Sequence, residues 1–374
     1  MKFGWKKTLL YSLIPALVLF VLFESAARLI EIWVPPWQVD YGWGFDAGSR
    51  LFVPSPDDPG TLITNPPKEV SFRKQQFAMP KPPGTFRIFM LGGSNVNVLY
   101  SNLLTFAEEL TQECGGHPRV EIVNAGGNAY GTHRLVPILL EVLGYEPDLI
   151  LFYEANNEFE EVEQLELVDL RKLALQRFIY KSALCRFIRD RIASVQVSQM
   201  QKEHNQRILA NPMADFKSGA SHTYTTQEIS ERMAAFRSNL AFMITTCQTR
   251  GVPFILGTVP SNLWKPDLHD DGVKQQAQAL YDRGEYEKGC ALVREALKHS
   301  GRHQSSDTEN AILRDLANEC HVPLADVETA ITDAEPHHVP GETLFTDRCH
   351  MHLNGYLILL RVFKDPILKI VNGT

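Results

Sequence analysis

The sequence predicts an α/β protein, a three-layer α/β/α sandwich built around a five-stranded parallel sheet. From Phe86 onward, short apolar runs alternate with longer amphipathic stretches. Parallel strands that are covered on both faces have such continuous apolar runs. The 374 residues are 44% apolar and 22% charged, which is the composition of a folded protein with a sizeable core.

Five apolar segments are the expected strands. They are 86–91, 120–125, 148–154, 252–260 and, more weakly, 322–328. Four amphipathic segments between or beside them are the expected helices: 104–114, 132–144, 226–249 and 308–320. Parallel strands need long crossover connections, so strands separated by helices predict a sheet with helices on both faces.

The N-terminal segment predicts a membrane anchor. Residues 8–23 carry no charge and follow three lysines within the first seven positions. A helix of that length reaches only about 24 Å against about 30 Å of hydrocarbon, so we expect it to continue and the anchor to occupy residues 1–34. A cleaved signal peptide is the alternative, because Ser25-Ala26-Ala27 offers small residues. The lysines predict a cytoplasmic N-terminus and a body outside the cytoplasm, in the periplasm.

Behind the anchor, residues 35–85 are rich in Pro and Gly and are expected to form a lead-in, followed by one main domain over residues 86–374. Helical insertions are expected at 159–225 and 261–306. The second contains a segment with the spacing of a single tetratricopeptide-like helical hairpin. One such unit cannot bury its own apolar face, so we expect it to pack on the main domain or on a protein partner.

Charge and cysteine content exclude several classes of function. A net charge of −7, with no clustered basic stripe, argues against nucleic-acid binding. The six cysteines are scattered and include no CxxC pair, so neither a small disulfide scaffold nor a structural zinc site is expected. The sequence predicts no cofactor.

Polar residues follow the predicted strands at the edge where ligands bind in open parallel sheets. Ser94 follows the first strand, and the glycine-rich stretch 124–132 follows the second. Asn157 follows the third, and Asp347 and His350 lie near the C-terminus. Serine, amide donors, aspartate and histidine at one edge are the groups that serine-based acyl transfer requires.

Two other readings of this edge are weaker. Asp347 and His350, together with His337, His338 and His352, suggest a metal site, but the strand ends supply no further ligands. The thiol next to His350 suggests a cysteine nucleophile, but adjacent residues rarely present their side chains to each other. No bound metal is therefore expected.

Four segments resemble the sequence blocks of the SGNH/GDSL hydrolase family, over roughly residues 68–365. They are "FMLGGSN", "VNAGGNAYGT", "YEANNEF" and "FTDRCHMHLNGY". The stretches "KPPGTFRIFMLGGS" and "GVPFILGTVPSNL" resemble membrane-anchored bacterial members. The resemblance implies a flavodoxin-like sandwich and a serine esterase.

The resemblance also implies a role for each site residue. Ser94 would be the nucleophile, His350 the general base and Asp347 the residue that orients the imidazole. The backbone N–H groups of Ser94 and Ala129 and the side-chain amide of Asn157 would form the oxyanion hole. Glycine is commoner at the position of Ala129, and alanine fits there if its backbone dihedral angles are ordinary.

The expected reaction is hydrolysis of an O-acylated glycan, lipid or small-molecule ester. Two alternatives stay open at the level of sequence. One is a non-catalytic relative that serves as an interaction or assembly subunit of a membrane complex. The other is an O-acyltransferase, which needs the same triad. The two insertions are expected to shape the substrate pocket or to bind a partner.

Overall fold

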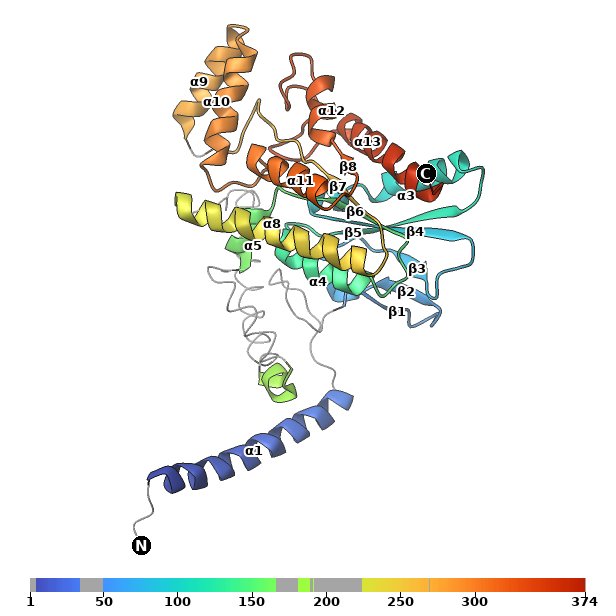
Figure 1. The fold of residues 1–374 in the computed structure, drawn as a ribbon, viewed down its shortest axis with the longest axis vertical. Helices are drawn as coiled ribbons and strands as arrows, with labels where there is room; N and C mark the ends of the chain where they lie inside the picture. Colours follow the sequence, from blue (N-terminus) through green and yellow to red (C-terminus); the bar gives the residue numbers. More distant parts are fainter. Residues whose placement is uncertain are drawn as a thin grey trace, which may run out of the picture. The chain divides into compact units, whose positions relative to one another are not determined.

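The structure is a computed structural model that describes residues 5–33, 50–165, 181–188, 191, 224–268 and 270–373 (Figure 1). Most of the predicted insertion 159–225 and the start of the predicted lead-in lie outside these residues. The chain divides into two compact units. One holds the N-terminal helix together with the described residues 181–188 and 191, and the other holds the main body.

The main body is built on a parallel sheet of five strands, which confirms the predicted fold class. The order is β5-β4-β6-β7-β8. The strands are β4 (Thr85–Gly92), β5 (Arg119–Gly126), β6 (Leu149–Tyr153), β7 (Phe254–Gly257) and β8 (Leu324–Ala325). In a sheet of this flavodoxin-like order, the crevice for ligands lies where the chain switches direction, between β4 and β6.

The register of the three central strands brings their carboxyl ends together. Gly92, the last residue of β4, lies opposite Gly126 of β5 and Tyr153 of β6. A Cβ at Gly92 would lie 2.3 Å from the carbonyl oxygen of Tyr153, so only glycine allows this approach. The segments that leave these three strands therefore start side by side.

Helices cover both faces of the sheet, as predicted (Figure 1). One face is covered by α3 (Tyr100–Glu113) and α13 (Leu353–Val371), and the other by α4 (Thr132–Val142), α8 (Thr226–Thr249) and α11 (Asp307–Glu319). The prediction of a strand over 322–328 is wrong at its end. The carboxylate of Asp326 caps the N-terminus of α12 (Val327–Ala334), which ends β8 after two residues.

Three short strands precede the main sheet. They are β1 (Phe52–Pro54), β2 (Thr61–Thr64) and β3 (Gln76–Ala78), and they form an antiparallel sheet. Phe52 and Phe77 are buried and pack edge-on against each other within the main core. Strands of three or four residues carry too little periodicity to be read from sequence, so this sheet was not predicted.

A short 3₁₀ helix, η1 (Pro66–Lys68), lies between β2 and β3.

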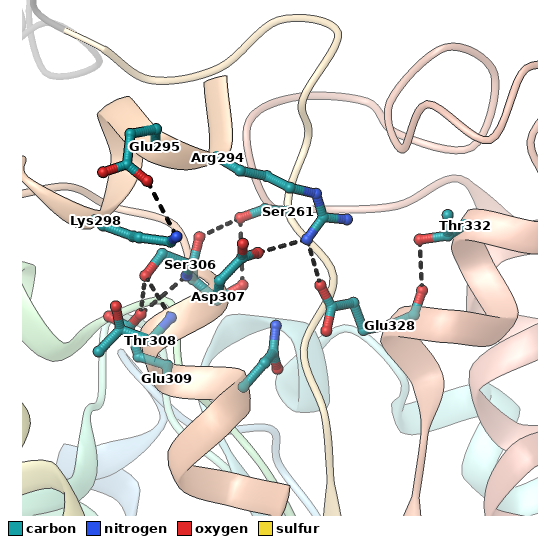
Figure 2. Close-up of polar contacts among 12 residues, drawn as sticks. Ser261, Arg294, Glu295, Lys298, Ser306, Asp307, Thr308, Glu309, Glu328 and Thr332 are labelled. Carbon is teal, nitrogen blue, oxygen red and sulfur yellow. Dashed lines mark hydrogen bonds and ion pairs between the residues drawn. The ribbon is translucent and has the colours of Figure 1, made fainter. Parts of the chain in front are cut away.

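The second insertion contains a helical hairpin, α9 (Asp271–Asp282) and α10 (Tyr286–Lys298). The hairpin packs on the main body. Figure 2 shows Arg294 of α10 between Asp307 of α11 and Glu328 of α12, with 3.0 Å between Arg294 Nη1 and Glu328 Oε1. The buried apolar residues of the hairpin, among them Tyr281 and Val293, pack in one cluster with Leu263, Leu268 and Val339 of the main body.

The other unit contains α1 (Trp5–Trp33), whose residues 13–33 are long and apolar enough to cross a membrane. By length and composition this helix is a membrane span or a signal sequence. One face of it contacts the described residues 181–188. Glu24 accepts hydrogen bonds from the backbone N–H groups of Ala183 and Leu184, both at 3.0 Å.

Candidate active site

Ser94 is the first residue of a short helix, α2 (Ser94–Asn97), which begins directly after β4. Gly93 is the N-cap residue of this helix. A Cβ at Gly93 would lie 2.1 Å from Oε2 of Glu154 and 2.2 Å from Nδ2 of Asn157. Glycine is therefore required there, because these two side chains lie directly against the turn. Ser94 itself is half-buried.

Ser94, His350 and Asp347 form a chain of two hydrogen bonds, with His350 in the middle. The Ser94 Oγ is 2.7 Å from Nε2 of His350. The other ring nitrogen, Nδ1, is 2.8 Å from Oδ2 of Asp347. This is the geometry in which a histidine takes a proton from serine while a carboxylate fixes its tautomer.

The Asp347 carboxylate is held by its own loop. Its Oδ1 accepts hydrogen bonds from the backbone N–H of Cys349 at 2.9 Å and from that of His350 at 2.7 Å. Partial burial raises the pKa of Asp347, but the hydrogen bonds from the His350 ring and from these N–H groups outweigh it and lower the pKa to about 2. Asp347 is therefore ionised at neutral pH and is oriented toward the imidazole.

Two side chains connect the Gly93–Ser94 turn to the loop that carries His350. The amide nitrogen of Asn95 donates to the carbonyl of Cys349 at 3.1 Å, and Tyr356 donates its hydroxyl proton to Oδ1 of Asn95 at 2.8 Å. On the far side, Asn262 donates to the carbonyl of Asp347 at 2.8 Å. Sequence reasoning missed these supports, because nothing in the local pattern pairs residues so far apart in the chain.

The three proposed oxyanion donors come from three different strand ends. Asn157 follows β6, and its side-chain amide donates one hydrogen bond to the carbonyl of Tyr130 at 3.2 Å, which leaves its second N–H available. Within the described part of the chain, the backbone N–H groups of Ser94 and Ala129 donate no hydrogen bond. Free donors beside a serine–histidine pair can stabilise a negatively charged oxygen.

The backbone of Ala129 does not meet the condition of ordinary dihedral angles under which alanine would fit this position. Its φ is +60°, in the left-handed region that disfavours residues with a Cβ. This explains why glycine suits the position better. The turn is held despite the strain, since Asn128 donates its N–H to the carbonyl of Ser71 at 2.9 Å and Tyr130 donates to Gly127 at 3.1 Å.

Replacing Ala129 by glycine is expected to stabilise the protein by about 1 kcal/mol and to keep the site intact, because glycine adopts this φ without strain. Urea unfolding of the full-length chain in detergent measures the change. The control is Ala125→Gly in β5, which should destabilise by about 0.5 to 1 kcal/mol. A destabilised Ala129→Gly variant would contradict the assigned backbone conformation.

The geometry argues against the metal reading. Ligand atoms of Asp347, Cys349 and His350 lie within 4.8 Å of one another. However, the two ring nitrogens of His350 already contact Ser94 and Asp347, so neither is left for an ion. Of the other histidines considered, His337 contacts Glu342 at 2.9 Å and does not join this cluster.

The thiol of Cys349 does lie close to the imidazole, contrary to the expectation for adjacent residues. Its Sγ is 3.7 Å from Nδ1 of His350. Burial raises the pKa of this thiol well above its usual value, with a further rise from the Asp347 charge. A buried, protonated thiol is a poor nucleophile, so Ser94 remains the better candidate.

No protein-family model and no curated protein sequence matches the chain. Among solved structures, it is similar to a GDSL-like lipase from Bacteroides thetaiotaomicron, with 11% identity, a TM-score of 0.39, and coverage of 76% of this chain and 88% of the lipase. It is also similar to an acetylxylan esterase from Geobacillus stearothermophilus, with 11% identity, a TM-score of 0.42, and coverage of 75% and 94%.

Proposed function

We propose that this chain is a serine esterase of the SGNH type, which hydrolyses O-acyl esters with Ser94 as nucleophile. The observation that carries the proposal is the pair of contacts made by His350, 2.7 Å to Ser94 and 2.8 Å to Asp347. The free donors at Ala129 and Asn157 support it, because acyl transfer needs an oxyanion site beside the nucleophile.

The mechanism follows from these positions. His350 Nε2 takes the proton of Ser94 as Oγ attacks the acyl carbonyl carbon, and Asp347 stabilises the imidazolium. The carbonyl oxygen, now negatively charged, accepts hydrogen bonds from the N–H groups of Ser94 and Ala129 and from Asn157. The alcohol leaves with the proton from His350. Water, deprotonated in turn by His350, then releases the acid from the acyl-enzyme.

An active-site phosphonate reagent tests the proposal. A fluorophosphonate reacts when an activated serine oxygen bonds to phosphorus and fluoride leaves. We expect stoichiometric labelling of the peptide that contains Ser94 in the full-length chain in detergent, with loss of aryl-ester hydrolysis in proportion. Hydrolysis that persists in fully labelled protein, or a folded protein that neither reacts nor hydrolyses, would contradict the proposal.

We further propose that α1 is a retained anchor that tethers the protein to a membrane, with the body outside the cytoplasm. The contacts between α1 and residues 181–188 support retention. Arg186 and Glu31 form a two-point ion pair, with 2.8 Å from Nε to Oε1 and 2.7 Å from Nη2 to Oε2. Ala27 between these contacts is only 3% exposed. Cleavage near this alanine would remove Glu24 and leave the segment that it caps without its carboxylate.

The intact mass of the protein extracted from membranes is expected to include the segment before Ala27. The reason is that α1 contacts a later part of the chain through several residues, which a removed signal sequence would not need. Mass spectrometry of the detergent extract measures this. A mature chain that begins close to residue 28 would contradict retention and would favour the signal-sequence alternative.

A further inference from the structure

Glu154 is a buried carboxyl group at the edge of the site to which the mechanism above assigns no task. It follows the last residue of β6, lies three residues before Asn157 and is 1% exposed. Within the described residues, no lysine, arginine or histidine forms an ion pair with it. A buried carboxylate without a cation destabilises the folded state, so Glu154 is a candidate for a functional role.

The contacts of Glu154 join two parts of the proposed oxyanion hole. Its Oε1 accepts hydrogen bonds from the backbone N–H of Asn156 at 2.6 Å and from that of Asn157 at 2.8 Å. Its Oε2 lies against Gly93, where a Cβ would come within 2.1 Å. One carboxyl group therefore holds the backbone of Asn157 and touches the turn that presents Ser94.

The same surroundings favour the protonated acid. Burial raises the pKa of Glu154 to about 8; the N–H of Asn157 opposes this, the charge of Glu158 adds to it, and the N–H groups of Asn156 and Gly93 oppose it. Oε2 accepts no hydrogen bond of good geometry among the described residues. At neutral pH the group is thus mostly uncharged, and a neutral acid does not repel an oxyanion beside it.

Three other titratable groups face Glu154 from the elements packed around it. They are Tyr153 of β6, Glu158 of α5 (Glu158–Leu165) and Cys349 of the loop that carries His350. Burial raises the pKa values of Tyr153 and Cys349 well above their ordinary ranges. Glu158 contacts Arg232 and accepts hydrogen bonds from Thr132. Of these groups, Glu154 is the one whose carboxyl lies against the Gly93–Ser94 turn.

We propose that Glu154 is a positioning residue of the oxyanion hole: its protonated carboxyl holds Asn157 against the Gly93–Ser94 turn, and loss of the proton disables the hole by placing a negative charge beside the oxyanion. The proposal rests on the proposed esterase function. It adds an alkaline limit to activity that the triad itself does not provide.

Glu154→Gln in the full-length chain in detergent is the direct test. Glutamine keeps an acceptor for the two N–H groups but has no proton to lose. The kcat of each protein for a short-chain aryl ester is therefore compared with its own value at pH 7, so that the shape of the pH profile is the readout. Between pH 7 and 10, wild-type kcat should fall about tenfold or more with a one-proton dependence, whereas the variant should not. An unchanged alkaline fall in the variant would overturn the proposal.

A matched control separates this role from a merely structural one. Glu335 is another buried glutamate, whose carboxylate accepts backbone N–H groups of Gly341 at 2.9 Å and Leu344 at 3.0 Å. Glu335→Gln removes a comparable carboxylate and should keep the alkaline fall. If Glu335→Gln abolishes the fall as Glu154→Gln does, the effect is general and the role of Glu154 is refuted.

Infrared spectroscopy gives a readout that needs no activity. A protonated buried carboxyl has its own C=O stretching band, which we expect at pH 7, lost on titration through about pH 8 and missing from Glu154→Gln. No such band at pH 7 would overturn the proposal. A band in a folded chain that hydrolyses no ester would support the protonated state of Glu154 and would contradict the proposed esterase function, so the two failures are distinguishable.

Discussion

Ser94→Ala is expected to lower kcat/KM for a short-chain aryl ester by about 10⁴ to 10⁶-fold, while the protein stays folded. Removing the nucleophile of a serine–histidine–aspartate triad leaves only the contribution of substrate binding and of the oxyanion hole. Ser94 is half-buried, and among the residues that the structure describes its hydroxyl forms a hydrogen bond with His350 alone, so the loss of Oγ costs little packing. Initial-rate kinetics of the full-length chain in detergent measure the change.

Ser101→Ala is the matched control for this variant. Ser101 lies in α3, seven residues further along the chain, and is exposed. Its substitution should change the rate by less than about twofold. Equal rates for Ser94→Ala and wild type would exclude Ser94 as the nucleophile and would leave the non-catalytic alternative as the better account.

Asp347→Asn is expected to lower kcat by about 10³ to 10⁴-fold with a small effect on the fold. The amide keeps the size of the carboxylate, and its oxygen can still accept the backbone N–H groups of Cys349 and His350. Its NH₂ group then faces Nδ1 of His350 and favours the wrong tautomer of the imidazole, in which Nε2 carries the proton. Rates at saturating ester measure kcat, and a loss below tenfold would contradict the role of Asp347.

The stability of the folded protein should also depend on the ionisation of Asp347, and the direction of this dependence follows from its pKa. The folded-state pKa of Asp347 is lowered from 3.8 to about 2. The contribution of this group is therefore fully present above its ordinary pKa and is lost as the pH falls from about 4 toward 2. Asp347→Asn should remove this part of the acid dependence, although the group is half-exposed and the effect on unfolding is small.

The fold could be predicted from sequence where strands are long, apolar and buried on both faces. Phe89 and Ile150 sit in such runs, and β4, β5, β6 and β7 were located from them. Two features of the fold were not predicted correctly. Residues 322–328 read as a strand because they are apolar, but the Asp326 cap starts a helix there. The sheet of β1, β2 and β3 depends on pairing between segments too short to show a period.

The candidate site could be predicted in part, because each strand end delivers a recognisable polar segment to one edge. That logic selected Ser94, Asn157 and His350 from separate places in the chain. It did not select Glu154 or the Tyr356–Asn95 contact, whose significance lies in burial and three-dimensional contacts. It also left the dihedral angles of Ala129 as an open condition, because backbone φ is set by the turn as a whole.

The central claim is that an acyl group passes through Ser94, and trapping that intermediate tests it most directly. The full-length chain in detergent is mixed with an aryl acetate, quenched with acid within the first turnovers and digested for mass spectrometry. We expect one acetyl group on the peptide that contains Ser94, absent from Ser94→Ala. An acetyl group found instead on the peptide of Cys349, or continued hydrolysis in Ser94→Ala at the wild-type rate, would contradict the account.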